Sequence, residues 1–206
     1  MSRLLLMGAG GHGKVVAEAA VACGQWAEIA FLDGLYPGHS RALDWPVVGS
    51  DREAAVFLSD YPEIFVALGD NHLRTTKIAD LVKVGFRIPV IVHPAAWVSP
   101  SAKLGDGTVV VAGAVVNAGA NLGFGCIVNT GATVDHDCRL ADGVHISPGA
   151  HVGGDSTIGA YTWIGIGAAI RHGIQIGARV IVGAGAAVVS DLPSDVVANG
   201  VPARIA

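Results

Sequence analysis

A six-residue repeat fills the second half of the chain and constrains the fold more than any other feature. From Val92 to Val188, every sixth residue is Val, Leu or Ile, at seventeen successive positions without an insertion. Neither the helical period of 3.6 nor the strand period of two produces a strict period of six. A coil with three flat sides does, because the aliphatic residue and a small residue four positions later both point inward. The sequence therefore predicts a parallel β-helix with three hexads per coil.

The repeat also sorts individual side chains into inward and outward positions. Cys126 and Cys138 occupy the small inward position, so they are expected to fill the core. His136 comes two residues after Val134, which places it at a corner facing outward. His145 and His151 each precede an aliphatic position, and strand alternation turns both outward.

The first half of the chain reads as a small α/β domain with a parallel sheet. Expected strands lie at residues 3–7, 28–33, 64–70 and 88–92, with helical segments at 14–23, 52–58 and 71–85. Gly8, Gly10 and Gly13 form G-x-G-x-x-G between a strand and a helix, and Asp33 follows about twenty residues later. This pattern favours a nucleotide pyrophosphate at the helix N-terminus. A whole NAD is disfavoured by the short length of this half, and a tight turn without a ligand stays open.

Composition and charge remove several classes of partner. The net charge of −4 gives no electrostatic footprint for nucleic acid or an anionic membrane. No uninterrupted apolar stretch has the length of a membrane span, and the N-terminus lacks the pattern of a signal peptide. Three cysteines without zinc-type spacing favour reduced thiols and a cytoplasmic location.

Several motifs together resemble one known family. They are G-A-G-G-H-G-K near the start, A-L-G-D-N-H-L-R after the third strand, N-T-G-A-T-V-D-H-D-C in the repeat region and G-V-P-A-R near the end. This combination resembles the bacterial sugar O- and N-acyltransferases with hexapeptide repeats. The family includes sialic acid O-acetyltransferases and N-acetyltransferases of UDP-4-amino-4,6-dideoxy sugars or GDP-perosamine.

The resemblance implies an α/β Rossmann-like half domain at residues 1–88 and a left-handed parallel β-helix of hexapeptide repeats at 89–206. It also implies a homotrimer with acetyl-CoA, the acetyl donor, bound between neighbouring β-helices. A nucleotide-linked amino sugar would be the acceptor, with no metal required and neither nucleic acid nor membrane as partner.

Site residues carry over from the family position by position. His136 matches the general base, and Asp137 matches the acid that raises the basicity of that histidine. The resemblance assigns four residues to acetyl-CoA: His145, Gly154, Ile166 and Ala184. It assigns seven to the sugar nucleotide: Gly10, Gly11, His12, Asp33, Gly34, Gly69 and Asn129. Two departures stand out, since Ala184 replaces a glycine, and Asp33-Gly34 stands where uridine-binding relatives have two acids.

The chemistry of these residues agrees with acetyl transfer. An amine attacking a thioester needs a base for its proton, and histidine titrates in the right range. An adjacent carboxylate raises the imidazole pKa and fixes the tautomer. A backbone N–H at the oxyanion and the joint binding of both substrates would supply further acceleration.

The leading prediction is therefore an acetyl-CoA-dependent N-acetyltransferase of a nucleotide-linked amino sugar, with O-acetyl transfer to sialic acid or another sugar as the alternative. A zinc hydratase is disfavoured because His145 and His151 fall on different faces of the coil, while His136 and His172 lie two coils apart. A purely structural or nucleotide-sensing scaffold remains a third class, and neither UDP nor GDP is favoured.

Overall fold

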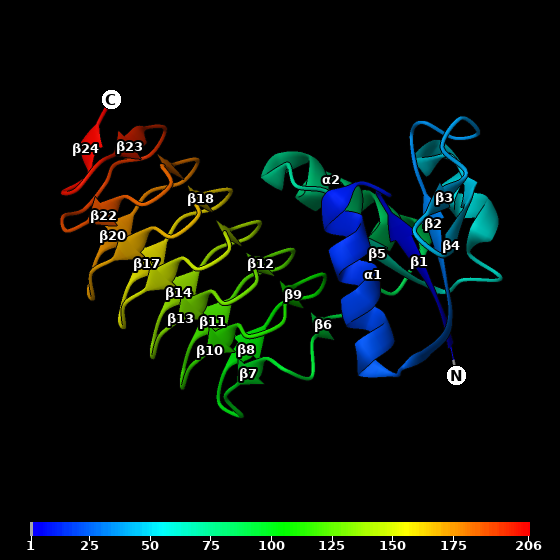
Figure 1. Cartoon of the computed structure of the whole chain (residues 1–206), viewed down its shortest axis with the longest axis horizontal. Helices are drawn as coiled ribbons and strands as arrows, with labels where there is room; N and C mark the ends of the chain where they lie inside the picture. The colour runs from blue at the N-terminus through cyan, green and yellow to red at the C-terminus, as the bar shows by residue number, and fades with distance from the viewer. Residues whose placement is uncertain (1) are drawn as a thin grey trace.

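The computed structural model describes residues 2–206, which form an α/β half and a β-helix packed against each other (Figure 1). The α/β half contains a five-stranded sheet in the order β3-β4-β2-β1-β5. Helix α1 (Gly11–Cys23) packs on one face of this sheet, while α2 (Asn71–Val84) and the 3-10 helix η1 (Asp51–Phe57) pack on the other. The strands are β1 (Ser2–Met7), β2 (Trp26–Leu32), β3 (Arg41–Ala42), β4 (Trp45–Gly49) and β5 (Glu63–Val66).

Three details of this half differ from the sequence expectation. Helix α1 begins at Gly11, three residues before the expected start at residue 14. The short antiparallel pair β3–β4 was not predicted; its connecting turn uses Leu43 in the left-handed region (φ 53°), a residue that gives no turn signal. The segment 88–92, expected as the last strand of the α/β sheet, instead contributes β6 (Ile91–Val92) to the β-helix, where it pairs with β9 (Val109–Val110). Ile91 lies fully buried among residues of α1 and the first coils.

Within residues 2–206 the β-helix has three sheets, of eight, six and five strands, that form its three faces. We name each face after one of its strands. The β15 face contains β6, β9, β12 (Ile127–Val128), β15 (His145–Ile146), β18 (Trp163–Ile164), β21 (Ile181–Val182), β23 (Val197–Asn199) and β24 (Arg204–Ile205). The β16 face contains β7 (Trp97–Val98), β10 (Val115–Val116), β13 (Thr133–Val134), β16 (His151–Val152), β19 (Ala169–Ile170) and β22 (Ala187–Val188). The β17 face contains β8 (Lys103–Leu104), β11 (Asn121–Leu122), β14 (Arg139–Leu140), β17 (Thr157–Ile158) and β20 (Gln175–Ile176).

The interior of the β-helix follows the repeat. Aliphatic residues such as Val116, Val134 and Ile164 are fully buried, and residues eighteen apart pair in register on successive coils. Cys126 and Cys138 are also fully buried and join this core, as their position in the repeat predicts. Burying one such aliphatic side chain contributes about 1.5–3 kcal/mol, so the stacked coils supply a continuous core.

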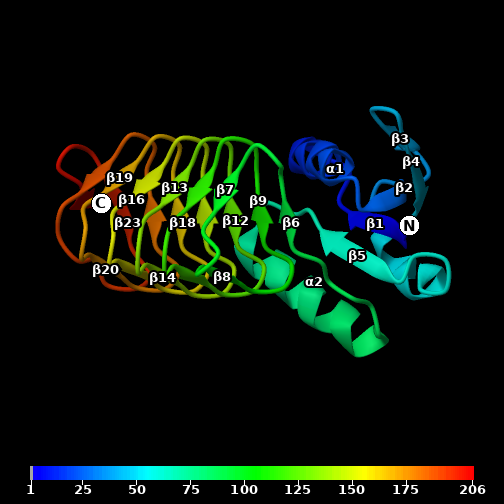
Figure 2. The same ribbon diagram turned by 90° about the horizontal axis from the view of Figure 1, so that it is seen from below.

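The α/β half covers the lower part of the β15 face. Helix α1 lies between the five-stranded sheet and the first coils (Figure 2), and the outward side chains of Val109 and Ile127 are buried in this contact. Higher on the same face, Trp163 and Ile181 keep about half of their surface exposed. One face of a regular solenoid is therefore divided into a covered and an open part.

Helix α2 runs along the corner that precedes the β15 face. At this corner Gly107, Gly125 and Gly143 occupy equivalent positions in successive coils with φ between 63° and 69°. A Cβ at Gly125 would meet Ile78 at 3.0 Å, and one at Gly143 would meet Thr75 at 2.8 Å, so α2 approaches the backbone closely. The next two corner positions are Tyr161, whose ring lies against His72 at the start of α2, and Arg179. Both adopt the same left-handed conformation with side chains present.

Candidate functional site

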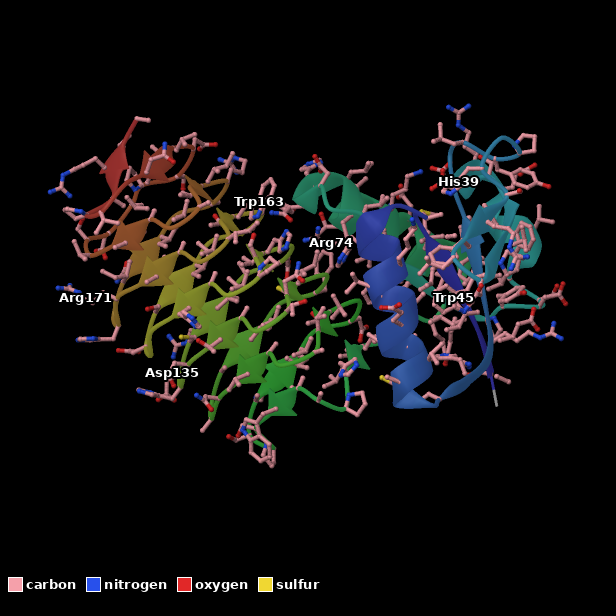
Figure 3. The ribbon with its side chains drawn as sticks, viewed as in Figure 1. His39, Trp45, Arg74, Asp135, Trp163 and Arg171 are labelled. Atoms are coloured by element: carbon pink, nitrogen blue, oxygen red, sulfur yellow. The ribbon has the colours of Figure 1, made fainter. Side chains whose placement is uncertain are left out.

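The structure divides the predicted site residues into two groups on different sides of the β-helix. One group lies where the carboxyl ends of the α/β strands meet the β15 face, and we call this region the interdomain cleft. The other group is the turn between β13 and β14, where the β16 and β17 faces join, and we call it the His136 corner. In Figure 3, Trp163 and Arg74 lie on the side toward the α/β half, whereas Asp135, the neighbour of His136, lies at the far edge.

At the His136 corner, the imidazole pairs with its neighbouring acid. The Nδ1 atom of His136 lies 3.0 Å from Oδ2 of Asp137, and because a carboxylate only accepts, Nδ1 carries the proton and donates. This bond, together with the charges of Asp135, Asp137 and Asp155, raises the pKa of His136 above its ordinary value. The ring is more than half exposed, so its Nε2 lone pair is accessible to an incoming molecule.

Gly154 lies directly against the His136 ring on the next coil. A Cβ at this position would lie 2.5 Å from Nε2 of His136, so a larger residue would displace the ring from its present position. Within residues 2–206, the N–H of Gly154 has no backbone acceptor, whereas Gly153 and Asp155 donate to Ile170 and His136. A free N–H beside a basic imidazole is the arrangement that an oxyanion formed at a thioester requires.

In the interdomain cleft, the glycine loop opens α1 in a form that suits an anion. Gly10 is the N-cap of α1 and has no side chain to satisfy the first N–H groups, and Cβ atoms at Gly10 or Gly11 would meet nothing within 4 Å. At Gly13 a Cβ would clash with the carbonyl oxygen of Gly8, so this glycine serves the close packing of helix on strand. Gly10 and Gly11 therefore present open backbone, while Gly13 is structural.

The acid at the end of β2 supports this loop. Asp33 accepts hydrogen bonds from the N–H of Ala9 (2.8 Å) and the N–H of Leu35 (2.9 Å), which link the loop to β2. Gly34 follows at the same edge beside Asp51, and Gly69 follows β5, which pairs with β1. The predicted nucleotide residues of the α/β half thus converge at one sheet edge.

His145 projects outward from the β-helix, as the repeat predicts, but its side chain does not reach solvent. Only 8% of the residue is exposed, because the α/β half covers this part of the β15 face. Its Nε2 lies 3.3 Å from Nδ2 of Asn129, and its ring stacks on Trp163 with centroids 5.6 Å apart. Its Nδ1 is buried without a hydrogen-bond partner.

Burial governs the titration of the two histidines of the cleft. Desolvation, and then the charge of Arg74, lowers the pKa of His145 to about 3 and that of His12 to about 4. Both rings are therefore neutral at physiological pH, and Nε2 of His12 is also buried without a partner. Two neutral imidazoles with unused ring nitrogens beside open backbone N–H groups are suited to hydrogen-bond a polar ligand.

A cavity of about 510 Å³ opens from the cleft toward the upper coils. It brings together two predicted residues, Gly69 and His145, and seven that the sequence did not single out: Asp70, Asn71, His72, Tyr161, Trp163, Arg179 and Ile181. Trp163 could have been noticed as an aromatic residue eighteen positions after His145. The other residues line the cavity only because the start of α2 packs beside the coils that carry them.

Ile166 and Ala184 continue this side of the molecule upward. Both lie at the corner that follows the β15 face, in successive coils, and the N–H of Gly185 donates to the carbonyl of Ile166. Ile166 is 61% exposed, so the corner offers an apolar strip above Asn129.

The described residues contain no group of three or more His, Cys, Asp or Glu side chains that could hold a metal ion. His145 and His151 belong to different faces, and His151 bonds to Thr133. Between Ser2 and Ala206 no helix has both the length and the apolar character needed to cross a bilayer.

Comparison with known proteins adds independent information. Residues 3–81 match the family model described as the PglD N-terminal domain, and residues 155–189 match the bacterial transferase hexapeptide model. The acetyltransferase domain of PglB from Neisseria gonorrhoeae FA1090, solved with acetyl coenzyme A, is 46% identical with a TM-score of 0.94, and the match covers 99% of this chain and 98% of that one. The chain belongs to this acetyltransferase family.

Two further members of the family are similar to the chain. PerB from Caulobacter crescentus, solved with CoA and GDP-perosamine, is 41% identical with a TM-score of 0.94, covering 100% of this chain and 98% of PerB. The UDP-N-acetylbacillosamine N-acetyltransferase of Bacillus subtilis (strain 168) is 36% identical over 115 residues, and the match spans 54% of this chain and about half (52%) of that relative. The expected family and the left-handed hexapeptide β-helix are thus confirmed.

Proposed function

We propose that this member of the acetyltransferase family transfers the acetyl group of acetyl-CoA to the amino group of a nucleotide-linked amino-deoxy sugar. The observation that carries the proposal is the His136 corner, where an exposed imidazole with a raised pKa lies against the free N–H of Gly154. The ligands named for PglB and PerB, acetyl coenzyme A and GDP-perosamine, support the same pairing of substrates.

In the proposed reaction, Nε2 of His136 accepts a proton from the sugar amine as its nitrogen attacks the thioester carbonyl. The new C–N bond forms as the carbonyl oxygen becomes an oxyanion, which the N–H of Gly154 stabilises. The C–S bond then breaks, and His136 returns the proton to the departing CoA thiolate. Asp137 holds the imidazole in the tautomer with Nδ1 protonated throughout.

The nucleotide would bind in the interdomain cleft. Open backbone at Gly10 and Gly11 faces the helix N-terminus that suits a diphosphate. Asn129 and His145 lie next to this edge and offer polar groups to the sugar or to the acetyl group. The strip formed by Ile166 and Ala184 extends from there along the corner and provides room for the pantetheine arm.

We also propose that the protein works as a homotrimer. Within one chain, the cleft and the His136 corner lie on different sides of the β-helix, so a sugar bound in the cleft does not reach His136. The β16 face lies between the His136 corner and the corner of Asn129 and Ile166, and it carries the outward side chains Trp97, Val115, Thr133, His151, Ala169 and Ala187. The β17 face instead carries Lys103, Asn121, Arg139, Thr157 and Gln175.

A ring of three copies packed through their β16 faces would bring the His136 corner of one copy to the cleft of the next. Light scattering tests the trimer directly, and a stable, active monomer would contradict it. Mixing two inactive variants, His136→Asn and Gly11→Glu, provides a sharper test. If each site needs both copies, random mixed trimers should regain up to about a quarter of the wild-type activity.

The reaction itself is tested by release of free CoA from acetyl-CoA, detected with a thiol reagent. The acceptors are UDP- and GDP-linked 4-amino-4,6-dideoxy sugars and sialic acid. Turnover with one amino sugar establishes N-acetyl transfer and identifies the nucleotide. Turnover with sialic acid alone would move the protein to the O-acetyl alternative. The prediction of a cytoplasmic location accompanies the proposal and rests on three free thiols, Cys23, Cys126 and Cys138.

A further inference from the structure

Arg74, on the first turns of α2, is a fully buried cation at the boundary between the two halves of the chain. Within residues 2–206 it forms no ion pair with a carboxylate. All of its hydrogen bonds go to neutral acceptors, which are four backbone carbonyls and the side-chain oxygen of Asn71. Burial lowers its pKa to about 10, so the side chain stays charged at neutral pH. Burying an unpaired charge costs free energy, so packing alone does not account for an arginine at this position.

The guanidinium group connects the α/β half to two coils of the β-helix. Nη1 donates to the carbonyls of Leu68 (3.0 Å) and Gly69 (3.3 Å) in the turn after β5. Nε donates to the carbonyl of Gly125 at 2.8 Å, and Nη2 to the carbonyl of Gly143 at 3.0 Å. The rigid fork of an arginine can reach acceptors on both sides at once, which a lysine ammonium on its flexible stem cannot.

Asn71 extends this connection to a third coil. Its Oδ1 accepts from Nη2 of Arg74 at 2.8 Å, and its Nδ2 donates to the carbonyl of Tyr161 at 3.0 Å. Gly125, Gly143 and Tyr161 are equivalent corner positions of three successive coils, eighteen residues apart. The first turn of α2 is therefore tied to a ladder of carbonyls along the axis of the β-helix.

The turn after β5, which contains Leu68 and Gly69, packs closely against the glycine loop. A Cβ at Gly8 would lie 2.8 Å from Leu68 Cδ2 and 3.0 Å from the carbonyl oxygen of Ala67, and the N–H of Ala67 donates to the carbonyl of Met7. A shift of the Gly69 turn would therefore move the start of the glycine loop as well. Whatever fixes Leu68 and Gly69 against the coils also fixes the edge that would hold a nucleotide.

We propose that Arg74, together with Asn71, is a positioning residue that sets the height of the nucleotide-binding edge on the β-helix, so that a bound sugar is presented at the acyl-transfer site. The inference rests on the proposed function for its substrate. Its geometry, a fork between the Gly69 turn and the carbonyls of Gly125 and Gly143, stands independently of that function.

The test compares Arg74→Met, Arg74→Lys and Asn71→Ala with the wild type, and Arg87→Met serves as the matched control. Arg87 is an exposed arginine paired with Glu63 at the far end of the same half. The readouts are steady-state kinetics with both substrates varied, calorimetric binding of CoA, and amide hydrogen exchange.

For Arg74→Met we expect the KM of the nucleotide sugar to rise about twentyfold or more, while the Kd of CoA stays within about twofold, because the strip at Ile166 and Ala184 does not contact Arg74. The KM of the nucleotide sugar in Arg74→Lys should lie within about threefold of that in Arg74→Met, since a lysine keeps the charge but lacks the forked guanidinium group that bridges the two halves. Asn71→Ala should raise the same KM by a smaller factor, and Arg87→Met should change neither constant.

Hydrogen exchange separates this proposal from the proposed function. In Arg74→Met, amides of residues 67–75 should exchange about tenfold faster, with coils 109–188 unchanged. If the wild type acetylates no nucleotide sugar but this exchange pattern appears, the connection stands and the proposed function falls. Unchanged exchange at 67–75, full recovery by lysine, or an equal loss in the binding of both substrates would each overturn the role of Arg74. If Arg74→Met does not fold, Arg74→Lys and Asn71→Ala decide by the same measurements.

Discussion

His136 and His145 lie nine residues apart in the same repeat, and both project outward, yet the structure gives them opposite properties. His136 stands at an open corner beside three acids, and its pKa is raised. His145 is covered by the α/β half, and its pKa falls to about 3. The repeat alone does not distinguish the two environments. The α/β half creates the difference, because it buries part of the β15 face and leaves the His136 corner exposed to water.

The strongest test of this contrast is to remove the imidazole at the open corner. We expect His136→Asn to lower kcat by about 10²–10⁴, the usual contribution of general-base catalysis, while the melting temperature stays unchanged because the ring is mostly exposed. CoA release measures the loss. His172→Asn, which changes an exposed histidine two coils higher in the same column, is the control and should keep full activity.

A second change acts on His136 through its neighbour. Gly154→Ala would place a methyl group 2.5 Å from Nε2 of His136, too close for the ring to keep its position beside the free N–H. We expect kcat to fall by about a hundredfold, with little change in the binding of either substrate, because misplacing a catalytic group by about 1 Å has an effect of this size. A wild-type kcat in this variant would show that the ring does not need its observed position.

The buried histidine should be visible in stability rather than in rate. Above about pH 6.5 His145 is neutral in both the folded and unfolded chain; below it, the unfolded chain takes up a proton that the folded chain refuses, so stability is lost as the pH falls. From pH 7.5 to pH 5 this loss should be about 2 kcal/mol.

His145→Phe keeps an aromatic ring on Trp163 and removes the titration. Urea unfolding at the two pH values should therefore show a pH dependence about 2 kcal/mol smaller than in the wild type. A pH dependence in His145→Phe equal to that of the wild type would contradict the burial of His145 in solution.

The smallest expected effect concerns the acid beside His136. Asn tolerates the left-handed backbone of Asp137 (φ 58°), so Asp137→Asn removes the charge with little strain. Because the base must be unprotonated, kcat rises with pH through the pKa of His136, which Asp137 holds above its ordinary value. The variant should shift this rise to lower pH and reduce the plateau by about tenfold. A pH–rate profile that does not move would assign the raised pKa to Asp135 and Asp155 instead.

The sequence predicted the interior of the β-helix because each inward position is set by local periodicity. It also predicted the pairing of His136 with Asp137, which are adjacent in the chain, but it placed the start of the first helix at residue 14 rather than at Gly11. It did not predict the burial of His145, the cavity beside Trp163 or the contacts of Arg74. These depend on where the α/β half packs along the axis of the β-helix. Because the hexads resemble one another, the repeat carries almost no information about that position. The pair β3–β4 was missed because Leu43 is not a turn-forming residue.

The glycine column beneath α2 gives that height a physical origin. A solenoid looks nearly the same after a shift of one coil, so a domain packed on its side could in principle dock at several equivalent levels. Gly107, Gly125 and Gly143 admit the helix, whereas the next two corner positions carry side chains, and the ring of Tyr161 lies against His72 at the start of α2. Five corner residues thereby break the translational symmetry of the repeat. The corner residues thus set which coil the α/β half packs against. Inserting or deleting one coil below Tyr161 would change the position of the α/β half along the β-helix, and not only the length of the β-helix.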